Sequence, residues 1–231
     1  MTLPEWRVFD DADALVGTLA AAVCVEAEAA IAARGVFHLV LAGGSTPRAL
    51  YRALADRHAG DARWHVWYGD ERCLPADHPG RNSVMVEAAW LSASRIPPEN
   101  RRPIPAERGA QAAATQYADW LKQVSNFDVV LLGMGEDGHT ASLFPGHDWG
   151  DAVDSPDVLA VHAAPKPPPE RVSLSVARLN RSQHVWFVIT GLGKREALRR
   201  WKSGEALPMT AVRGRQETVV WLDAAARPED A

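Results

Sequence analysis

The chain has little cysteine. Only Cys24 and Cys73 occur among its 231 residues, so the sequence excludes a framework of several disulfides. A low cysteine count of this kind is typical of proteins from a reducing compartment.

The sequence also lacks histidines and cysteines at the spacing typical of metal ligands. His147 and Asp148 follow His139 closely, but there is no H-x-x-x-H pair and no cysteine cluster. We therefore expect no bound metal.

The chain also lacks a basic amino-terminal segment and a long unbroken apolar run. Residues 1–15 do not have the pattern of a signal peptide, and no apolar run approaches the ~20 residues that span a bilayer. We expect a cytoplasmic protein with no membrane partner. The net charge of −4 lacks the basic excess that non-specific nucleic-acid binding needs, so no nucleic-acid partner is expected. A small anionic ligand stays compatible with this charge, because a few cations in one cleft are enough to bind it.

Apolar runs alternate with helical stretches along the whole sequence, and 47% of the residues are hydrophobic, which is enough for a large core. This alternation predicts an α/β fold: a single three-layer α/β/α domain over residues 1–231 with a mostly parallel, Rossmann-like sheet. The expected strands are 37–42, 64–68, 127–132, 171–176, 184–189 and 218–222. The expected helices are 11–33, 47–56, 82–91, 109–124 and 193–202, and the proline-rich segment 163–169 is expected to be loop.

The most informative segment is GMGEDGHTASLFP at 133–145, directly after the apolar strand 127–132. Ligands of open α/β sheets bind at the carboxyl ends of the strands. At that point the sequence carries Asp137 and His139, two residues apart. A histidine accepts a proton near neutral pH, and a carboxylate can fix its tautomer, so the pair predicts a general base with its supporting acid. Because no G-x-S-x-G elbow is present, the expected nucleophile is water.

The same segment contains the spacing G-x-G-x-x-G at Gly133, Gly135 and Gly138, which is the pattern of a dinucleotide-binding turn. Such a turn must open a helix whose amino terminus holds the pyrophosphate. Here Pro145 follows seven residues after Gly138, where that helix would be running, and proline inside a helix costs about 3 kcal/mol. We therefore reject a nicotinamide site and expect no cofactor.

A second segment, LAGGSTPR at 41–48, joins a strand to a helix through paired glycines. Gly44 lets the backbone approach a ligand closely, and the unpaired amides at a helix amino terminus attract anions. Ser45 and Thr46 add hydroxyl groups there. The alternative is a well-capped helix with no ligand, which explains either hydroxyl residue alone. The paired glycines favour a phosphate site.

Further candidates follow other strands. Asp70 and Glu71 stand after the strand 64–68 and suit acid–base chemistry, while Arg72 suits an anion or an oxyanion. The alternative for this group is a solvated loop with an internal ion pair. Lys194, in the turn after strand 184–189, and Arg171, beside the proline-rich loop, are candidate cations for a phosphate. Taken in isolation, Lys194 is better explained as an ordinary exposed lysine, and the same reservation applies to Arg171.

Taken in order, these segments resemble 6-phosphogluconolactonase, and the resemblance spans about residues 37–200. The match at 131–146 is the most specific. The resemblance implies a modified Rossmann-like fold shared with the glucosamine-6-phosphate isomerase/deaminases, and a hydrolase of the oxidative pentose phosphate pathway. The expected substrate is the phosphosugar lactone 6-phospho-D-glucono-1,5-lactone. The segments that carry the resemblance are LAGGSTPR (41–48), GDER (69–72), RNS (81–83), LLGMGEDGHTASLFPG (131–146), ERVSLS (170–175) and TGLGK (190–194).

The resemblance also assigns roles to individual residues. His139 matches the general base that activates water, Asp137 matches the acid of the same motif, and Arg72 matches an arginine near the substrate. Two further residues, Asp70 and Glu71, are expected to support the site or to contact substrate. The residues expected to hold the substrate phosphate are Gly44, Ser45, Thr46, Arg171 and Lys194.

Two other functions stay open at this point. A glucosamine-6-phosphate isomerase/deaminase has a glutamate shortly after its catalytic histidine, in a sequence resembling GHIAFNEP, whereas no carboxylate lies between His139 and Asp148 here. A non-catalytic sugar-phosphate sensor is expected to carry a basic helix-turn-helix segment, and none is visible. Oligomeric state, monomer or dimer, is left undecided by the sequence.

Overall fold

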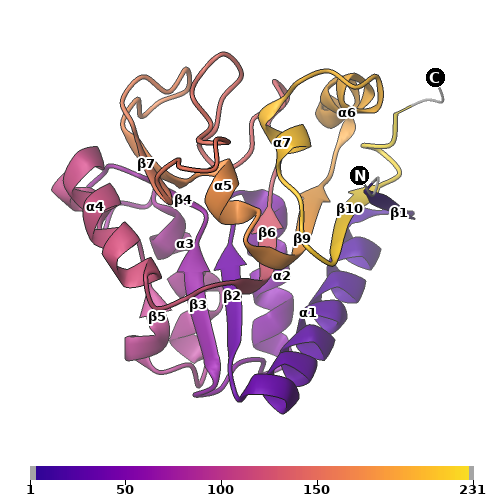
Figure 1. Ribbon diagram of the computed structural model, residues 1–231. Coiled ribbons are helices and arrows are strands. Elements are labelled where there is room, and N and C mark those ends of the chain that lie inside the picture. Colours follow the sequence, from indigo (N-terminus) through magenta and orange to yellow (C-terminus); the bar gives the residue numbers. More distant parts are fainter. Residues whose placement is uncertain (1–3, 229–231) are drawn as a thin grey trace.

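A central sheet of seven parallel strands organises the structure, a computed structural model that describes residues 4–228 (Figure 1). All six strand pairings in this sheet are parallel. This confirms the expected α/β class and its mostly parallel sheet. In spatial order the strands are β1 (Glu5–Phe9), β10 (Glu217–Asp223), β9 (Ser182–Ile189), β6 (Phe127–Leu132), β2 (Phe37–Leu41), β3 (Trp64–Tyr68) and β5 (Arg101–Arg102).

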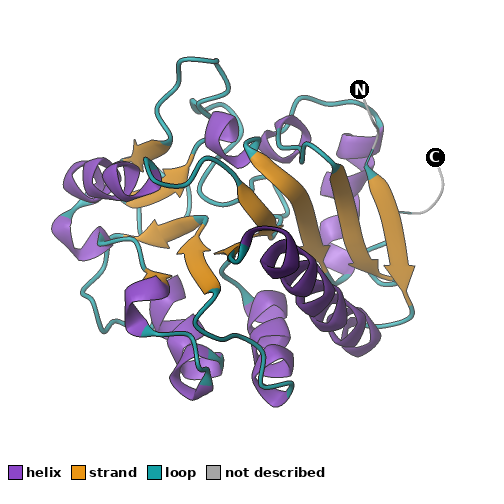
Figure 2. Cartoon of the chain, turned by 60° about the horizontal axis from the view of Figure 1, so that its bottom comes forward, coloured by secondary structure: helices purple, strands orange, loops and turns teal. Residues whose placement is uncertain are grey.

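Helices cover both faces of the sheet and make it the middle layer of three (Figure 2). The expected helices are confirmed within one to three residues at each end. Residues 133–145, after β6, contain no helix. The helices are α1 (Ala12–Arg34), α2 (Ser45–Asp56), α3 (Asn82–Ala89), α4 (Ala110–Leu121), α5 (Val176–Leu179), α6 (Arg195–Lys202) and α7 (Pro208–Ala211), with short 3₁₀ turns at Leu91–Ala93, Pro98–Asn100, Ala106–Arg108 and Leu192–Lys194.

Helix α1 is the longest. Asp11 caps its amino end by accepting a hydrogen bond from the amide of Ala14 at 2.8 Å, and Gly35 ends it in the left-handed region at φ 78°. By length and composition alone, α1 is long and apolar enough to cross a membrane, which the sequence reading had not expected of any segment. In the structure its stripe from Leu15 to Ala30 is buried in the core, and a core helix passes the same test.

A second, smaller sheet was not predicted. It is antiparallel, in the order β4 (Asp70–Arg72), β8 (Arg171–Leu174) and β7 (Val158–Val161). Its strands are three or four residues long, so they leave almost no alternation for a sequence pattern to register. The expected strand 171–176 accordingly stops at Leu174, and Ser175 caps the short helix α5 instead, accepting from the amide of Arg178.

The strands β2 and β6 separate at their carboxyl ends. Their register contains only Leu39 with Val129 and Val40 with Val130, although β2 stays paired with β3 as far as Leu41. The chain runs outward from β2 to β3 and β5, then returns to the other side of β2 to form β6. This is the point where strand order reverses, and ligand sites of open α/β sheets lie there.

The carboxylate of Glu71 joins the small sheet to α3. It accepts hydrogen bonds from the amides of Asn82 and Ser83, both at 2.8 Å, and Arg81 Nε lies 3.5 Å from it. Glu71 is fully buried and Arg81 is 3% exposed. Glu71 therefore satisfies amides at the start of the helix that no intrahelical carbonyl can reach.

Replacing Glu71 with alanine should lower the free energy of unfolding by about 3 kcal/mol, because two helix amides lose their acceptor and the buried guanidinium of Arg81 loses a neighbouring carboxylate. Urea unfolding followed by tryptophan fluorescence measures this difference. Glu87→Ala, on the exposed side of the same helix, is the matched control and should cost less than about 1 kcal/mol. Equal losses in the two variants would contradict the capping role.

Candidate active site

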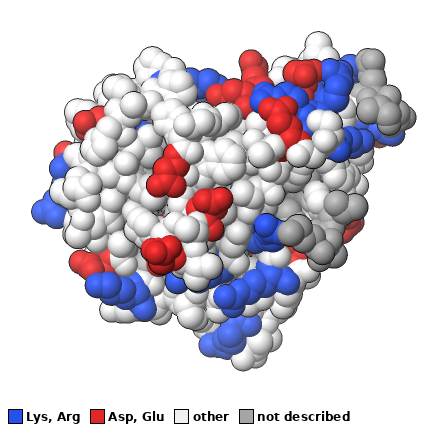
Figure 3. All heavy atoms as spheres, turned by 45° about the horizontal axis from the view of Figure 1, so that its top comes forward, with Lys and Arg blue, Asp and Glu red and all other residues white. Residues whose placement is uncertain are grey.

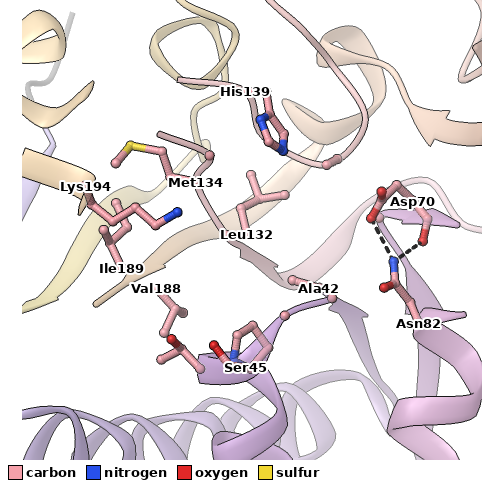
Figure 4. A pocket seen from close by; sticks show the side chains of 18 of the residues that line it. Ala42, Ser45, Asp70, Asn82, Leu132, Met134, His139, Val188, Ile189 and Lys194 are labelled. Atoms are coloured by element: carbon pink, nitrogen blue, oxygen red, sulfur yellow. Dashed lines mark hydrogen bonds between the residues drawn. The ribbon is translucent and has the colours of Figure 1, made fainter. Parts of the chain in front are cut away.

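A cavity of about 450 Å³ opens where β2 and β6 separate (Figure 4). Four strand ends supply most of its walls. The lining comprises 42–47 after β2, residues 69, 70 and 72 after β3, residues 132–136, 139 and 141 after β6, and residues 188–190 and 194 after β9. Asn82, Lys166 and Arg171 complete it.

The motif after β6 brings an acid and an imidazole together. His139 Nδ1 lies 2.5 Å from Asp137 Oδ1, and the ring packs against Phe144 with centroids 4.8 Å apart. The turn closes on itself, since the amide of Gly135 donates to the carbonyl of His139 at 2.8 Å. A Cβ at Gly135 would lie 2.0 Å from His139 Nδ1 and 2.4 Å from Asp137 Oδ1. The pair therefore depends on a position without a side chain.

Burial decides the charge of this histidine. It lowers the pKa of His139 below the ordinary 6.5, although the hydrogen bond and charge of Asp137 act to raise it. Burial by itself would raise the pKa of Asp137, but the hydrogen bond to His139 brings it below its ordinary value. At neutral pH the pair is thus a carboxylate and a neutral imidazole. With Nδ1–H donating to Asp137, the free nitrogen Nε2 is left as the proton acceptor.

The loop after β2 opens onto the same cavity. Helix α2 begins at Ser45, Gly44 takes a left-handed φ of 116°, and no side chain caps the helix. Thr46 Oγ1 instead lies 2.6 Å from Thr190 Oγ1, at the end of β9. The structure therefore does not have the alternative arrangement, in which the hydroxyl of Ser45 or Thr46 caps α2. The first-turn amides have no intrahelical partner and are available to an anion.

Four cationic side chains and two carboxylates line the cavity: Arg72, Lys166, Arg171 and Lys194, and Asp70 and Glu136. Lys194 reaches in from the turn after β9, and burial lowers its pKa, partly offset by Glu136 (Figure 4). Arg72 Nη1 bonds to the carbonyl of Gly80, while its buried Nε has no hydrogen-bond partner among residues 4–228. Asp70 accepts from Ser142 Oγ at 2.7 Å and from Asn82 Nδ2 at 3.1 Å.

Arg171 also lines the cavity, but most of its guanidinium is engaged elsewhere. Its Nε donates to the carbonyl of Pro168 at 3.1 Å, and Nη2 donates to the carbonyls of Lys166 at 2.9 Å and Pro167 at 3.1 Å. It is 5% exposed. Burial lowers its pKa below the ordinary arginine value, with Asp70 acting in the opposite direction. Arg171 is thus both a wall of the cavity and the clamp of the proline-rich loop.

Residues 10–221 match the family described as glucosamine-6-phosphate isomerases/6-phosphogluconolactonase. The chain belongs to this family. It is 35% identical over 244 residues to the 6-phosphogluconolactonase of Streptomyces coelicolor, covering 96% of this chain and 93% of that protein. The crystal structure of 6-phosphogluconolactonase from Thermotoga maritima superposes with a TM-score of 0.88 at 28% identity, covering 96% of this chain and 100% of that one.

A longer relative shares the same region. The chain is 39% identical over 196 residues to the GDH/6PGL endoplasmic bifunctional protein of the rabbit, but spans only 24% of that protein's length. The activities of that longer protein are therefore not transferred as a whole. The family membership rests on the relatives matched over nearly their full length.

Most residues singled out in the sequence meet in this family member's cavity. Asp137 stands behind His139 without lining the cavity, and Glu71 lies in the core, so it supports α3 and does not face a ligand. The sequence reading assigned no role to Lys166, Asn82, Glu136 or Thr190, which also line the cavity. The predicted residues that do line it are His139, Arg72, Asp70, Gly44, Ser45, Thr46, Arg171 and Lys194.

The face that carries the strand ends has few lysines and arginines at its centre (Figure 3). Basic side chains gather toward its rim, and acidic ones are scattered across it. Arg171, which lines the cavity and bonds to the proline-rich loop, is buried below this surface.

Among residues 4–228, no group of three or more histidine, cysteine, aspartate or glutamate side chains is arranged to hold a metal ion.

Gly135→Ala should lower kcat by about 10²-fold, because the new methyl group displaces the imidazole from its carboxylate while the backbone there suits alanine. Steady-state kinetics on the substrate proposed below provides the measurement. Gly133→Ala is the matched control, since a Cβ there would meet only the carbonyl of Gly43 at 3.8 Å, an ordinary contact. A Gly135→Ala enzyme with unchanged kcat would show that the close pairing of Asp137 and His139 is dispensable.

Proposed function

We propose that this protein is a 6-phosphogluconolactonase that hydrolyses 6-phospho-D-glucono-1,5-lactone to 6-phospho-D-gluconate in the oxidative pentose phosphate pathway. One observation carries the proposal: a neutral histidine backed by a carboxylate, and an uncapped helix amino terminus beside a lysine, open onto one cavity. Full-length relatives carry the same name. A phosphosugar lactone carries a phosphate and an ester carbonyl. Its hydrolysis therefore requires both an anion site and a general base.

The proposed reaction begins with water in front of His139. Nε2 takes a proton as the water oxygen bonds to C1 of the lactone, and the carbonyl becomes an oxyanion. The guanidinium of Arg72, which lines the cavity, is the donor proposed for that oxyanion. Collapse breaks the bond between C1 and the ring oxygen, and the imidazolium returns its proton to that oxygen. The product is an open-chain acid, and His139 is neutral again.

The phosphate is proposed to bind at the start of α2. The amides and hydroxyls of Ser45 and Thr46 supply donors, Gly44 allows close approach, and Lys194 supplies charge. A bound dianion favours the protonated form of Lys194 and so offsets the effect of burial on its pKa. We assign Arg171 a smaller direct part, because two of its three nitrogens already bond to the loop carbonyls.

The isomerase/deaminase activity is the rival within the family. It requires ring opening and proton transfer between C1 and C2, which take more acid–base groups than attack of water on an ester. The turn after His139 carries no carboxylate before Asp148, so the second group is missing from that segment. Asp70 does line the cavity, but it is bonded to Ser142 and Asn82. The lactonase is the function that these groups support best.

The deciding experiment measures the loss of freshly generated 6-phosphogluconolactone with and without the protein, since the lactone also hydrolyses spontaneously. Glucosamine-6-phosphate turnover is assayed in parallel. We expect rapid lactone loss and no ammonia release. Ammonia release alone would assign the deaminase activity, and sugar-phosphate binding without either reaction would assign a sensor. We keep a cytoplasmic location within this proposal, which the two free thiols of Cys24 and Cys73 suit.

His139→Ala should lower kcat by about 10²–10⁴-fold with little change in KM, because the general base is lost while the phosphate site stays intact. Initial rates corrected for spontaneous hydrolysis measure both constants. His162→Ala, an exposed histidine outside the cavity, should behave as wild type. A wild-type kcat in His139→Ala would refute the proposed base.

Lys194→Ala should chiefly raise KM, because phosphate anchoring stabilises the bound substrate and the transition state alike. The measurement is again steady-state kinetics, with inorganic phosphate as a competitive inhibitor that should bind the variant more weakly. Lys122→Ala, at an exposed position directly after α4, serves as the control. A large fall in kcat at constant KM would place Lys194 at the reacting carbonyl.

A further inference from the structure

The proline-rich loop 163–169 is fixed to the catalytic segment through Arg171. The guanidinium of Arg171 bonds to three consecutive carbonyls of the loop, Lys166 to Pro168. The same guanidinium lies over the ring of Phe144, 5.6 Å from its centroid, and His139 packs against that ring as well. The loop therefore has a defined position relative to the base, and the residue it presents there is Lys166.

Lys166 shares an acceptor with the base. Its Nζ lies 3.5 Å from Asp137 Oδ1, the oxygen that His139 Nδ1 approaches at 2.5 Å. The ammonium also lines the cavity. An ammonium and an imidazolium on one carboxylate oxygen repel each other, whereas an ammonium and a neutral imidazole do not.

We propose that Lys166 is a positioning residue that keeps His139 neutral, and so ready to accept a proton. Its ammonium lies beside Asp137 Oδ1, the same oxygen that His139 Nδ1 contacts, and there it disfavours a second positive charge on the imidazole. The proposal rests on the proposed role of His139 as the general base. Lys166 acts through Asp137, so it needs no contact with the reacting atoms.

The other charges around His139 determine the sign of the effect. Asp137 and Asp70 favour the imidazolium, whereas burial and Lys166 disfavour it. Lys194 and Arg200 face Asp137 from the segment after β9, and Arg200 Nη1 reaches the carbonyl of Asp137 at 3.5 Å. When the charge of Lys166 is removed, Asp137 and Asp70 still favour the imidazolium, and one of the cations that disfavours it is gone. The imidazolium is then favoured, so the pKa of His139 should rise.

A simpler role for Lys166 is direct contact with the substrate phosphate. The two roles predict different kinetics. A phosphate ligand that is lost raises KM and leaves the acid limb of kcat/KM in place, because that limb reports the free enzyme. A charge that controls His139 moves the limb. The geometry favours the second role, since Lys166 is paired with Asp137, whereas Lys194 forms no ion pair within residues 4–228.

The experiment compares Lys166→Met with Lys166→Arg in the full-length protein. The acid limb of kcat/KM, recorded between about pH 5 and 8, should move to higher pH by about 0.5–1 unit in Lys166→Met. Lys166→Arg keeps the charge and should restore the wild-type limb. Lys122→Met controls for the loss of a surface lysine and should keep the wild-type limb.

A second readout does not depend on turnover. The ring carbon resonance of His139, assigned by its disappearance in His139→Gln, is titrated by NMR in wild type and in each variant. Lys166→Met should raise this pKa by the same amount as the limb. An unmoved titration, or equal shifts in Lys166→Met and Lys166→Arg, would overturn the proposal. A protein with no lactonase activity would refute the proposed function, and the titration would still show whether Lys166 controls His139.

Discussion

The hydrogen bond between His139 Nδ1 and Asp137 Oδ1 sets both the tautomer and the orientation of the imidazole, so the chemistry of the cavity depends on it. The bond forms within a five-residue turn, and a turn that short has room for it only because Gly135 carries no side chain. The glycine spacing that imitates a dinucleotide turn is therefore explained by the pair itself. Its second glycine admits the pair, and its third, Gly138, takes the left-handed φ of 85° that reverses the chain.

Two opposing effects act on the base, and burial is the larger. Asp137 acts to raise the pKa of His139 and so favours the imidazolium, which cannot accept a proton. Burial against Phe144 removes water from the ring and lowers the pKa in spite of the carboxylate. The carboxylate can thus orient the ring without protonating it. A surface pair of the same two residues would have the orientation and lack the free base.

The sequence predicted the parts of this structure that repeat a pattern over enough residues. Strand β6 is buried along its whole length, and its residues 129–132 form a continuous apolar run. The motif after it lies at the carboxyl edge of the sheet, as parallel topology requires. The small antiparallel sheet escaped because its strands are too short to show alternation. The placement of Glu71 escaped for another reason: a carboxylate that caps α3 and one that faces a ligand look alike until burial is known. The contact of Lys166 with Asp137 was not predicted either. It depends on the bonds between Arg171 and the proline-rich loop, and no pattern in the neighbouring sequence indicates them.

The same switch point brings the proposed phosphate site and the proposed base into one cavity. Where β2 and β6 part, each strand delivers its own loop, one ending in the start of α2 and the other in the Asp137–His139 turn. The hydroxyls of Thr46 and Thr190, 2.6 Å apart, join the α2 loop to the end of β9, which is itself paired with β6. Movement of the α2 loop relative to His139 would have to break that bond and the sheet register together. The separation between the proposed phosphate site and the proposed base is thus held by backbone pairing, and in the proposed reaction the length of the substrate would select the carbonyl that reaches His139.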